Sequence, residues 1–420
     1  MKKTQLNTIG RAAMACVVLT ALTVQAGEVE VLHYWTSGGE AKAAAALKAT
    51  LQGKGHTWKD FAVAGGGGDN AMTVLKSRVV SGNAPAAAQI KGPSLQEWAA
   101  EGVLANIDDV AKAEKWDSLL PPVVANVMKY KGNYIAAPVN VHRVNWLWAS
   151  NDAFKKAGAK VPTNWDEFFV AAEALKKAGI IPVAHGGQNW QDFTTFESVA
   201  LGVGGADFYK KALVQLDQST LTGATMTKVL DTFKKVKTYT DKNAPGRDWN
   251  LATAMVIKGE AGMQMMGDWA KGEFLKAGKK PGTDFVCIRF PGTQGSVTFN
   301  SDQFAMFNQT DAGKQEAQVN MAKAIMDPAF QSAFNVVKGS VPARTDVPND
   351  AFDDCGKKGM ADLAEANTNG TLYGSMAHGH AAPAAVKNAT YDVITAAFNG
   401  EYADGAAAAA ALAEAVAAAQ

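Results

Sequence analysis

Apolar residues along this chain fall into short alternating runs separated by longer segments of helical composition. Residues 28–35 alternate and are rich in valine and aromatic side chains, which is typical of a strand. Residues 40–51 are rich in alanine and lysine, which favours a helix. The same order continues, with strands predicted at 57–64, 87–90 and 135–139 and helices predicted at 70–81 and 95–101. Because strands that alternate with helices are typical of parallel sheets, the pattern predicts an α/β fold.

The middle and end of the chain repeat this alternation. Pro162, Thr163 and Asn164 introduce a helix that is predicted over residues 165–178. Further helices are predicted at 206–216, 226–241, 253–259, 311–326 and 406–420, and strands at 180–184 and 262–266. The sequence contains no internal repeat, so the pattern does not indicate a repeat architecture.

The first twenty-six residues have the pattern of an export signal. Lys2, Lys3 and Arg11 are basic, residues 12–22 form an apolar run, and residues 24–26 offer small side chains for cleavage. The apolar run is too short to span a bilayer, and no later segment approaches twenty consecutive apolar residues. We therefore expect a signal peptide over residues 1–26 that is cleaved near Ala26, and a mature protein in the periplasm.

Length and charge narrow the classes of function. Without the signal, the chain is long enough for two domains with a core each. Loss of the three basic residues of the signal lowers the formal net charge from +1 to −2. A near-neutral chain lacks the basic surface that DNA or an anionic membrane requires, so no nucleic-acid partner is expected. An exported location also argues against ATP or NAD, and no cofactor is expected.

Two cysteines, Cys287 and Cys355, remain in the mature chain. In an oxidising compartment they are expected to pair as one disulfide, with two free buried thiols as the alternative. Neither cysteine lies in a Cys-x-x-Cys motif or beside a histidine, which argues against redox catalysis.

Short motifs occur in a specific order over nearly the whole mature chain. They lie at residues 32–40, 65–85, 134–143, 162–168, 258–269, 337–344 and 374–383. Together these segments resemble extracellular solute-binding proteins of sugar ABC transporters. The Gly-Asp-Trp at 267–269 and the Lys-Gly-Ser at 338–340 are most similar to the glucose/mannose-binding branch. Ala86 departs from the pattern, since many members carry aspartate after the preceding proline.

The resemblance implies a periplasmic binding protein fold of type II-like architecture. Two α/β lobes would be joined by a hinge, and the sugar would bind in the cleft between them. Because the chain crosses between the lobes more than once, each lobe is discontinuous. Residues 27–138 and 303–343 would form the N-terminal lobe, and residues 139–302 and 344–420 the C-terminal lobe.

A pyranose has apolar C–H faces and a polar rim, so its recognition needs flat aromatic surfaces and converging polar groups. By resemblance, Trp35, Trp249 and Trp269 are expected to stack against the sugar or to wall it in. The alternative for each tryptophan is a place in the hydrophobic core.

Charged and polar side chains complete the expected site. By resemblance these are Glu40, Gln89, Lys91, Asp302, Lys338 and His378, with Asn140, Asn300 and Trp190 as neighbours. Carboxylates accept hydrogen bonds from adjacent hydroxyls and lysines donate them, each bond contributing about 1.5–3 kcal/mol. The alternative for each charged residue is a solvated surface side chain. His378 and His380 lack a third ligand nearby in the sequence, so no metal site is expected.

The four glycines at 65–68 are better explained by close backbone packing than by phosphate binding. They are not followed by the Gly-Lys-Ser/Thr of a phosphate-binding loop. We expect them to let the backbone turn close to the cleft.

The predicted function is that of a monomeric binding protein. It would deliver a monosaccharide, with D-glucose favoured over mannose or a short oligosaccharide, to an inner-membrane ABC permease. A role as ligand carrier for a chemoreceptor is compatible with this function. The main alternative is a periplasmic glycoside hydrolase, in which Glu40 and Asp302 would act as the paired carboxylates.

Overall fold

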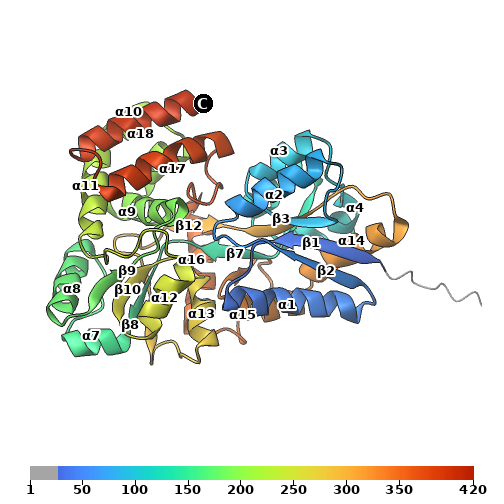
Figure 1. The fold of residues 1–420 in the computed structure, drawn as a ribbon. Coiled ribbons are helices and arrows are strands. Elements are labelled where there is room, and N and C mark those ends of the chain that lie inside the picture. The colour runs from blue at the N-terminus through green and yellow to red at the C-terminus, as the bar shows by residue number, and fades with distance from the viewer. Residues whose placement is uncertain (1–26) are drawn as a thin grey trace, which may run out of the picture.

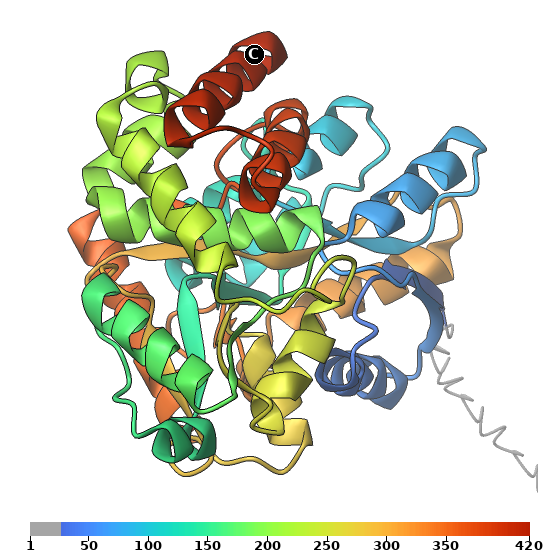
Figure 2. The same cartoon turned by 60° about the vertical axis from the view of Figure 1, so that its left-hand side comes forward.

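Two α/β lobes lie side by side in the computed structural model, which describes residues 27–420 (Figure 1). The same division is visible after a turn of 60° (Figure 2). The expected signal peptide, residues 1–26, lies outside the described residues. Within residues 27–420, no helix is both long and apolar enough to cross a membrane.

The first lobe is built on a five-stranded sheet. Its strand order is β2 (Thr57–Ala62), β1 (Glu28–His33), β3 (Ala87–Lys91), β13 (Asp302–Met306) and β6 (Ala136–Pro138). Strand β1 is parallel to β2 and β3, whereas β13 runs antiparallel between β3 and β6. In Figure 1, helices α2 (Asp69–Val80) and α3 (Ser94–Ala100) lie above this sheet, and α1 (Gly38–Gly53) and α15 (Pro328–Lys338) lie below it.

The second lobe is built on a four-stranded sheet. Its strand order is β11 (Phe285–Arg289), β8 (Trp146–Ser150), β10 (Ala261–Met265) and β9 (Ile181–Ala184). Its principal helices are α7 (Asn151–Ala157), α8 (Trp165–Lys177), α9 (Asn189–Tyr209), α11 (Ala224–Lys237), α12 (Trp249–Ile257), α13 (Ala270–Lys276), α17 (Ala384–Asn399) and α18 (Gly405–Ala419). The alanine-rich α18 is docked, since it packs against α11 and α17.

A third sheet lies where the chain passes between the lobes (Figure 1). Its strand order is β14 (Val341–Pro342), β7 (Asn140–Arg143), β12 (Val297–Asn300) and β15 (Leu372–Gly374). Strand β7 directly follows β6, β12 directly precedes β13, and β14 follows α15. We propose that these three passages form the hinge and divide the lobes at residues 138, 302 and 343. There are two separate hydrophobic clusters, and the one in the first lobe also includes residues of the hinge strands and of the chain after residue 343, namely Val139, Val141, Val297, Phe299, Leu363 and Ala366.

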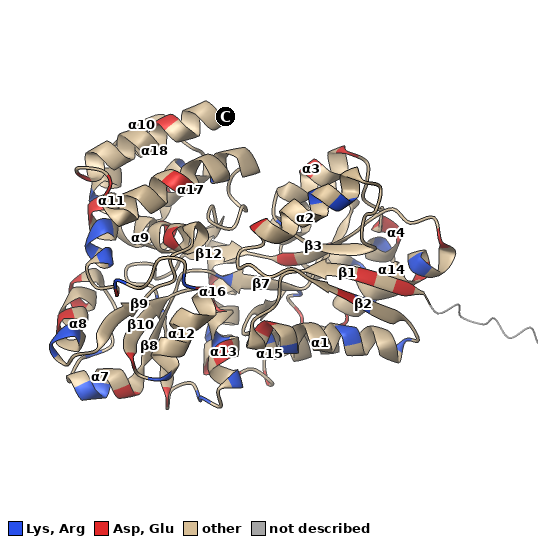
Figure 3. Cartoon of the chain, viewed as in Figure 1, with Lys and Arg blue, Asp and Glu red and all other residues tan. Residues whose placement is uncertain are grey.

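The remaining elements connect these parts. They are α4 (Asp108–Ala113), α5 (Trp116–Leu119), α6 (Pro122–Val127), β4 (Lys129–Tyr130), β5 (Asn133–Tyr134), the π-helical turn η1 (Lys210–Val214), α10 (Gln218–Leu221), α14 (Ala312–Ile325) and α16 (Asp354–Asn369). Acidic and basic residues are interspersed on both lobes in Figure 3, with no face of a single sign in that view.

The sequence pattern predicted residues 27–101 well, but it missed α4, α5, α6, β4 and β5 in the first lobe and several elements of the second lobe. Every strand and helix predicted up to residue 139 is confirmed, with ends within two residues. The helix predicted at 206–216 is confirmed in outline, because the backbone breaks at Gly205 and is helical again from Ala206, through the end of α9 and η1, to Val214. The part of α9 before this break, from Asn189, was not predicted. Most of α9 is buried on all sides, so it has no polar face to give a helical period.

The predicted disulfide is confirmed. Cys287 on β11 bonds to Cys355 on α16, with their Cα atoms 5.9 Å apart. The alternative of two free thiols is therefore wrong. The bond anchors α16 to the edge strand of the second lobe, shortly after the last passage between the lobes.

Candidate functional site

A cavity lies between the two lobes and draws its lining from both. Together with the open solvent at its mouth, the space it spans is about 350 Å³. Its lining residues are Tyr34, Trp35, Glu40, Gly66, Gly67, Lys91, His142, Trp190, Trp249, Trp269, Asp302, Lys338 and His378. Eight of the nine site residues expected from the sequence, all except Gln89, are among them.

Gln89 lies behind the cavity wall and does not line it. Its Nε2 donates a hydrogen bond to Asp302 Oδ1 at 3.0 Å, and its Oε1 accepts one from the Tyr34 backbone N–H at 3.2 Å. Gln89 is fully buried. Its role in the structure is therefore to position Asp302 and the end of β1.

The first lobe places its site residues at one edge of its sheet. Tyr34 and Trp35 follow β1, and Lys91 ends β3, so the carboxyl ends of two parallel strands meet at the cavity. Strand β13 runs the other way, and its first residue, Asp302, is paired with Lys91 across the sheet. In α/β sheets, ligands bind in the crevice outside the carboxyl ends of the strands.

Gly66 and Gly67 allow the first lobe to approach the tryptophans of the second. A Cβ atom at Gly66 would lie 2.9 Å from a ring carbon of Trp190 and 3.1 Å from one of Trp249. Gly67 has a φ of +82°, which side-chain-bearing residues rarely adopt. Both glycines thus have the close-packing role expected from the sequence.

The tryptophans wall the cavity and also belong to its supporting core. Trp35 packs against Phe304 and Phe334, with ring centroids 5.5 and 5.2 Å away. Trp269 lies edge-on to His142 and His378, each at 5.1 Å. Trp35 therefore both lines the cavity and belongs to the hydrophobic core, so the two alternatives stated for the tryptophans both apply to it.

A buried histidine links the carboxylates of the site. His142 contacts Asp302 through Nε2 at 2.9 Å and Asp268 through Nδ1. A carboxylate beside each ring nitrogen favours the doubly protonated, positively charged ring, which can donate to both. Burial opposes this charge, but the two carboxylates outweigh it and raise the pKa of His142 above its usual value.

Asp302 is held as a carboxylate by its surroundings. Burial alone would favour its neutral form, but His142, Lys91 and Lys338 bring its pKa well below the usual value. Asn140 Nδ2 donates to Asp302 Oδ2 at 3.0 Å, so the expected neighbour Asn140 supports the site from behind.

Of the other charged side chains that line the cavity in the described part of the chain, Lys338 and Glu40 form an ion pair and Lys91 does not. Lys338 Nζ lies 3.0 Å from Glu40 Oε1, and Lys338 is 2% exposed. Lys91 makes no hydrogen bond or ion pair within residues 27–420, and its Nζ lies 5.1 Å from the Tyr34 ring centroid. Burial lowers the pKa of His378 well below its usual value, so this ring is neutral.

Charges near the cavity cancel. On the lining, Glu40 and Asp302 balance Lys91 and Lys338. His142 also lines the cavity, and its charge is balanced by Asp268, which lies outside the lining. A cavity with no net charge suits an uncharged ligand, because a charged one would lose its hydration without a compensating partner.

Glu197 positions the segment that carries His378, and no sequence motif pointed to it. Its carboxylate accepts hydrogen bonds from the Ser375 hydroxyl at 2.5 Å and from the Met376 and Ala377 backbone N–H groups at 2.9 and 3.2 Å. Ser375 Oγ in turn accepts from the His378 N–H at 3.1 Å. Burial raises the pKa of Glu197 to about 7.

His380 is used in the hinge region. Its Nε2 accepts a hydrogen bond from the Ser301 backbone N–H at 3.0 Å. Burial lowers the pKa of His380 to about 4. Within residues 27–420, no three His, Cys, Asp or Glu side chains are grouped so as to hold a metal ion.

The lobes touch on both sides of the cavity. On one side, Glu273 Oε1 on α13 accepts a hydrogen bond from the Gly39 N–H at the start of α1 at 2.7 Å. On the other, Lys387 on α17 pairs with Asp69 on α2 at 3.2 Å. These contacts give the arrangement of a closed cleft.

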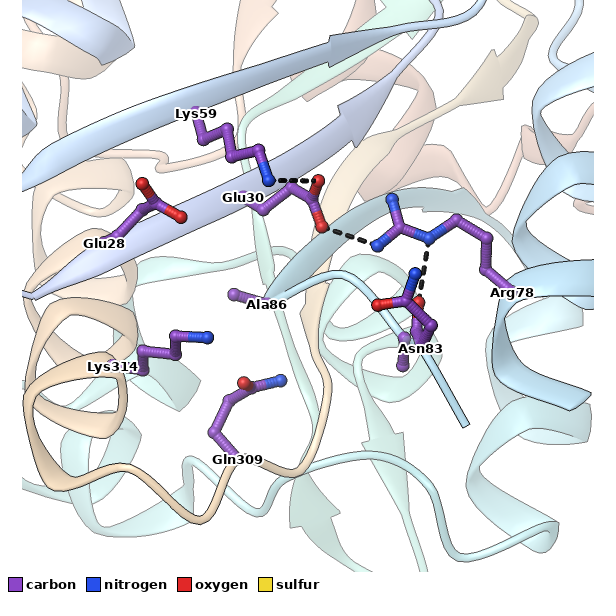
Figure 4. Close-up of a pocket in the computed structure, with 9 residues that line it drawn as sticks. Glu28, Glu30, Lys59, Arg78, Asn83, Ala86, Gln309 and Lys314 are labelled. Carbon is purple, nitrogen blue, oxygen red and sulfur yellow. Dashed lines mark hydrogen bonds and ion pairs between the residues drawn. The ribbon is translucent and has the colours of Figure 1, made fainter. Parts of the chain in front are cut away.

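A larger hollow of about 800 Å³ lies on the first lobe alone (Figure 4). Glu30 pairs there with Lys59 at 3.2 Å and with Arg78 at 2.6 Å. The main charged side chains of the hollow are therefore already paired with one another. The lining includes Ala86, the departure from the family pattern, and has no aromatic residue. The hollow therefore offers no stacking surface and is not the candidate site.

His142→Asn should reveal the protonation of the central histidine. The pKa of His142 is higher in the folded state than in unfolded chains, where a histidine has a pKa of about 6.5. Protonated His142 therefore stabilises the fold fully below about pH 6.5, and this stabilisation is lost as the pH rises through the folded-state pKa. Near pH 6, the free energy of unfolding of the variant should be about 2 kcal/mol lower than that of the unaltered chain, which is the contribution of a hydrogen bond to a charged group. Urea titrations from pH 5 to 9 should show this difference shrinking with pH; a constant difference would contradict a charged His142.

Comparisons with known proteins agree with this geometry. A family model described as bacterial extracellular solute-binding protein matches residues 35–329. A probable sugar-binding periplasmic protein of Rhizobium meliloti (strain 1021) is 61% identical over 390 residues, covering 93% of this chain and 94% of that protein. An uncharacterized ABC transporter extracellular-binding protein of Pyrococcus horikoshii is 34% identical over 379 residues, covering 89% and 84%.

Solved structures show the same fold at low sequence identity. The bacterial solute receptor AcbH, described as preferring β-D-galactopyranose, has a TM-score of 0.78 at 20% identity and covers 92% of this chain and 98% of its own. A chitin oligosaccharide binding protein has a TM-score of 0.78 at 18% identity and covers 94% and 99%. These likenesses confirm the predicted two-lobed α/β fold.

Proposed function

Because this chain belongs to the bacterial extracellular solute-binding protein family, we propose that it binds a sugar in the periplasm for import by an ABC transporter. The proposed ligand is a monosaccharide, with D-glucose favoured. The names of its relatives as sugar-binding periplasmic proteins support the class of ligand and the location. The proposed partner is an inner-membrane permease, and the proposed state is a monomer.

The observation that carries the proposal is the composition of the interlobe cavity. Four tryptophans, Trp35, Trp190, Trp249 and Trp269, provide flat apolar surfaces. Carboxylates and lysines around them balance in charge, so they can bond hydroxyl groups without favouring an ionic ligand. An uncharged ring with apolar faces and a rim of hydroxyls matches this lining.

The choice of D-glucose comes from the resemblance of residues 267–269 and 338–340 to the glucose/mannose-binding branch. Both segments contribute to the cavity, through Trp269 and Lys338. Micromolar affinity requires about −8 kcal/mol, or roughly −0.7 kcal/mol for each of the twelve or so heavy atoms of a hexose. Stacking and several charge-assisted bonds are sufficient for that amount.

Hydrolysis of a glycoside is less well supported. A glycosidase needs one carboxylic acid that holds a proton for the leaving group. Asp302 has a strongly lowered pKa, and Glu40 is paired with Lys338. Neither carboxyl is placed to act as that acid, which favours binding without bond cleavage.

Calorimetry on residues 27–420 with glucose, mannose, galactose, maltose and xylose tests the proposal. Glucose should bind with a dissociation constant of about 1 μM or lower and should raise the melting temperature by mass action. Heat with none of the five sugars would contradict the proposed ligand class. Release of nitrophenol from a nitrophenyl glycoside would favour the hydrolase instead.

A further inference from the structure

Four hydrogen-bond donors converge on the carboxylate of Glu197, which is fully buried on α9. Its Oε1 accepts from the Ser375 hydroxyl at 2.5 Å, and its Oε2 accepts from the Met376 and Ala377 N–H groups at 2.9 and 3.2 Å. The fourth donor is the Tyr209 hydroxyl, 3.2 Å from Oε2. An ionised carboxylate is an acceptor only, so it can satisfy all four donors at once.

The same helix also fixes the ring of His378, which lines the cavity between the lobes. Thr194 Oγ1, one turn before Glu197, lies 3.2 Å from His378 Nε2. The Thr194 hydroxyl donates its hydrogen to the Trp190 carbonyl at 2.7 Å, so Nε2 must be the donor of the contact with Thr194. The neutral ring then carries its acceptor at Nδ1, which can bond a sugar hydroxyl. Because Ser375 Oγ accepts from the His378 N–H at 3.1 Å, Glu197 holds the backbone that carries this ring.

The neighbouring Tyr209 gives a proton on Glu197 a partner. Its hydroxyl has one hydrogen and two acceptors within reach, Glu197 Oε2 at 3.2 Å and the Gly374 carbonyl at 3.1 Å. With a proton from solvent on Oε2, the tyrosine oxygen can accept that proton and donate its own hydrogen to Gly374. The two backbone N–H groups would then face a hydroxyl oxygen, which is a weaker acceptor than a carboxylate. A proton on Oε1 would instead deprive the serine hydroxyl of its acceptor.

The other titratable side chains around Glu197 keep one charge state near neutral pH. They are Tyr209, His378, and Tyr391 on α17, whose hydroxyl donates to the Ala377 carbonyl at 2.7 Å. Burial raises the pKa of both tyrosines well above its usual value and lowers the pKa of His378 well below its own. Burial also raises the pKa of Glu197, to about 7, so Glu197 alone among these groups changes its charge near neutral pH. Charged side chains on the helices packed against α9 are bonded elsewhere, Asp231 and Lys234 of α11 to the backbone of residues 402–405 and Lys387 of α17 to Asp69.

We propose that Glu197 is a positioning residue for sugar binding, and that the cleft binds sugar tightly only while this carboxyl is ionised. The inference rests on the proposed function, because it requires a ligand that bonds the His378 ring. The ionised form holds residues 375–377 by three hydrogen bonds to a charged acceptor, and the protonated form loosens the segment that carries His378. By linkage, sugar binding near pH 7 expels a proton from Glu197, and acid weakens the binding of sugar.

Calorimetry on the unaltered residues 27–420 is the first test, with the sugar that binds most tightly of the five named above. Affinity at pH 5.5 should be about fivefold or more below that at pH 8, as expected when bonds to a charged acceptor become bonds to a neutral one. At pH 7 the heat of binding should depend on the ionisation enthalpy of the buffer, because protons are released. Equal affinities at the two pH values, or a heat that is the same in every buffer, would overturn the inference and leave the proposed function intact. Binding of none of the five sugars at either pH would contradict both.

Glu197→Gln is the second test, because an amide has the shape of the protonated acid and never ionises. The variant should bind sugar at pH 8 about as weakly as the unaltered chain does at pH 5.5, and its affinity should change less than about twofold between the two pH values. Asp207→Asn, on the same helix with a side chain that is 78% exposed, is the matched control and should keep the affinity and pH dependence of the unaltered chain. Full pH dependence in Glu197→Gln would overturn the inference and assign the effect to another group, such as His142. If Glu197→Gln does not fold, the pH and buffer comparisons on the unaltered chain decide.

Discussion

Asp302→Ala is expected to abolish sugar binding and also to lower the free energy of unfolding by about 3–5 kcal/mol, the cost of breaking a buried ion pair by removing one partner. A residue that touched only the ligand would leave the stability of the free protein nearly unchanged. The structure indicates otherwise, because Asp302 is 2% exposed and bonds His142, Gln89 and Asn140. Its loss would leave the buried imidazolium of His142 with one carboxylate instead of two.

Denaturant unfolding and calorimetry on the same preparation measure both effects of Asp302→Ala. Asp346→Ala is the matched control, since Asp346 is 48% exposed and pairs with Arg344 at the surface. The control should change stability by less than about 1 kcal/mol and leave sugar affinity unchanged. An unaltered unfolding curve for Asp302→Ala would show that the network around His142 does not stabilise the fold.

Removal of the disulfide is expected to cost about 4 kcal/mol of stability on the chain-entropy relation for a loop of this length. The bond joins residues separated by 68 positions in the chain. Neither Cys287 nor Cys355 lines the cavity between the lobes. The double variant Cys287→Ser, Cys355→Ser should therefore unfold much more easily and still bind sugar within about threefold of the original affinity.

Reductant provides the control for the disulfide. Dithiothreitol should destabilise the unaltered chain by a similar amount and have no effect on the double variant. If reductant leaves the unaltered chain as stable as before, although mass measurement shows both thiols alkylated, the expected stabilisation is wrong. A large loss of sugar affinity in the double variant would instead connect α16 to the cleft.

The candidate site was predictable where short motifs carry the chemistry. Trp269 and Lys338 lie in distinctive tripeptides, and both line the cavity. His142 and Tyr34 also line it, but as single residues in strand-like segments they resemble ordinary core side chains. Glu197 lies on a helix that is buried all round, so its place beneath the His378 segment depends on packing alone.

Gln89 shows the limit of assigning roles by resemblance. It lies two residues before Lys91 on β3, and alternate side chains of a strand share a face. Its neighbour in space, Asp302, lies on a strand more than two hundred residues later in the chain. The Asp302 carboxylate accepts the hydrogen bond from the Gln89 amide that was expected to go to a ligand. Whether a polar residue bonds ligand or protein depended on this pairing of distant strands.

Local composition and periodicity predicted the class of fold and the strands and helices of the first lobe up to α3, and the count of cysteines predicted one disulfide. The fold class and the elements depend on residues that are neighbours in the sequence. The disulfide could be predicted because the mature chain has only two cysteines, so each has one possible partner. The tertiary structure alone decided that β13 lies between β3 and β6 and that His142 bridges two carboxylates. Each of these joins segments far apart in the chain, and their contacts follow from how whole sheets pack, which no local pattern of residues specifies.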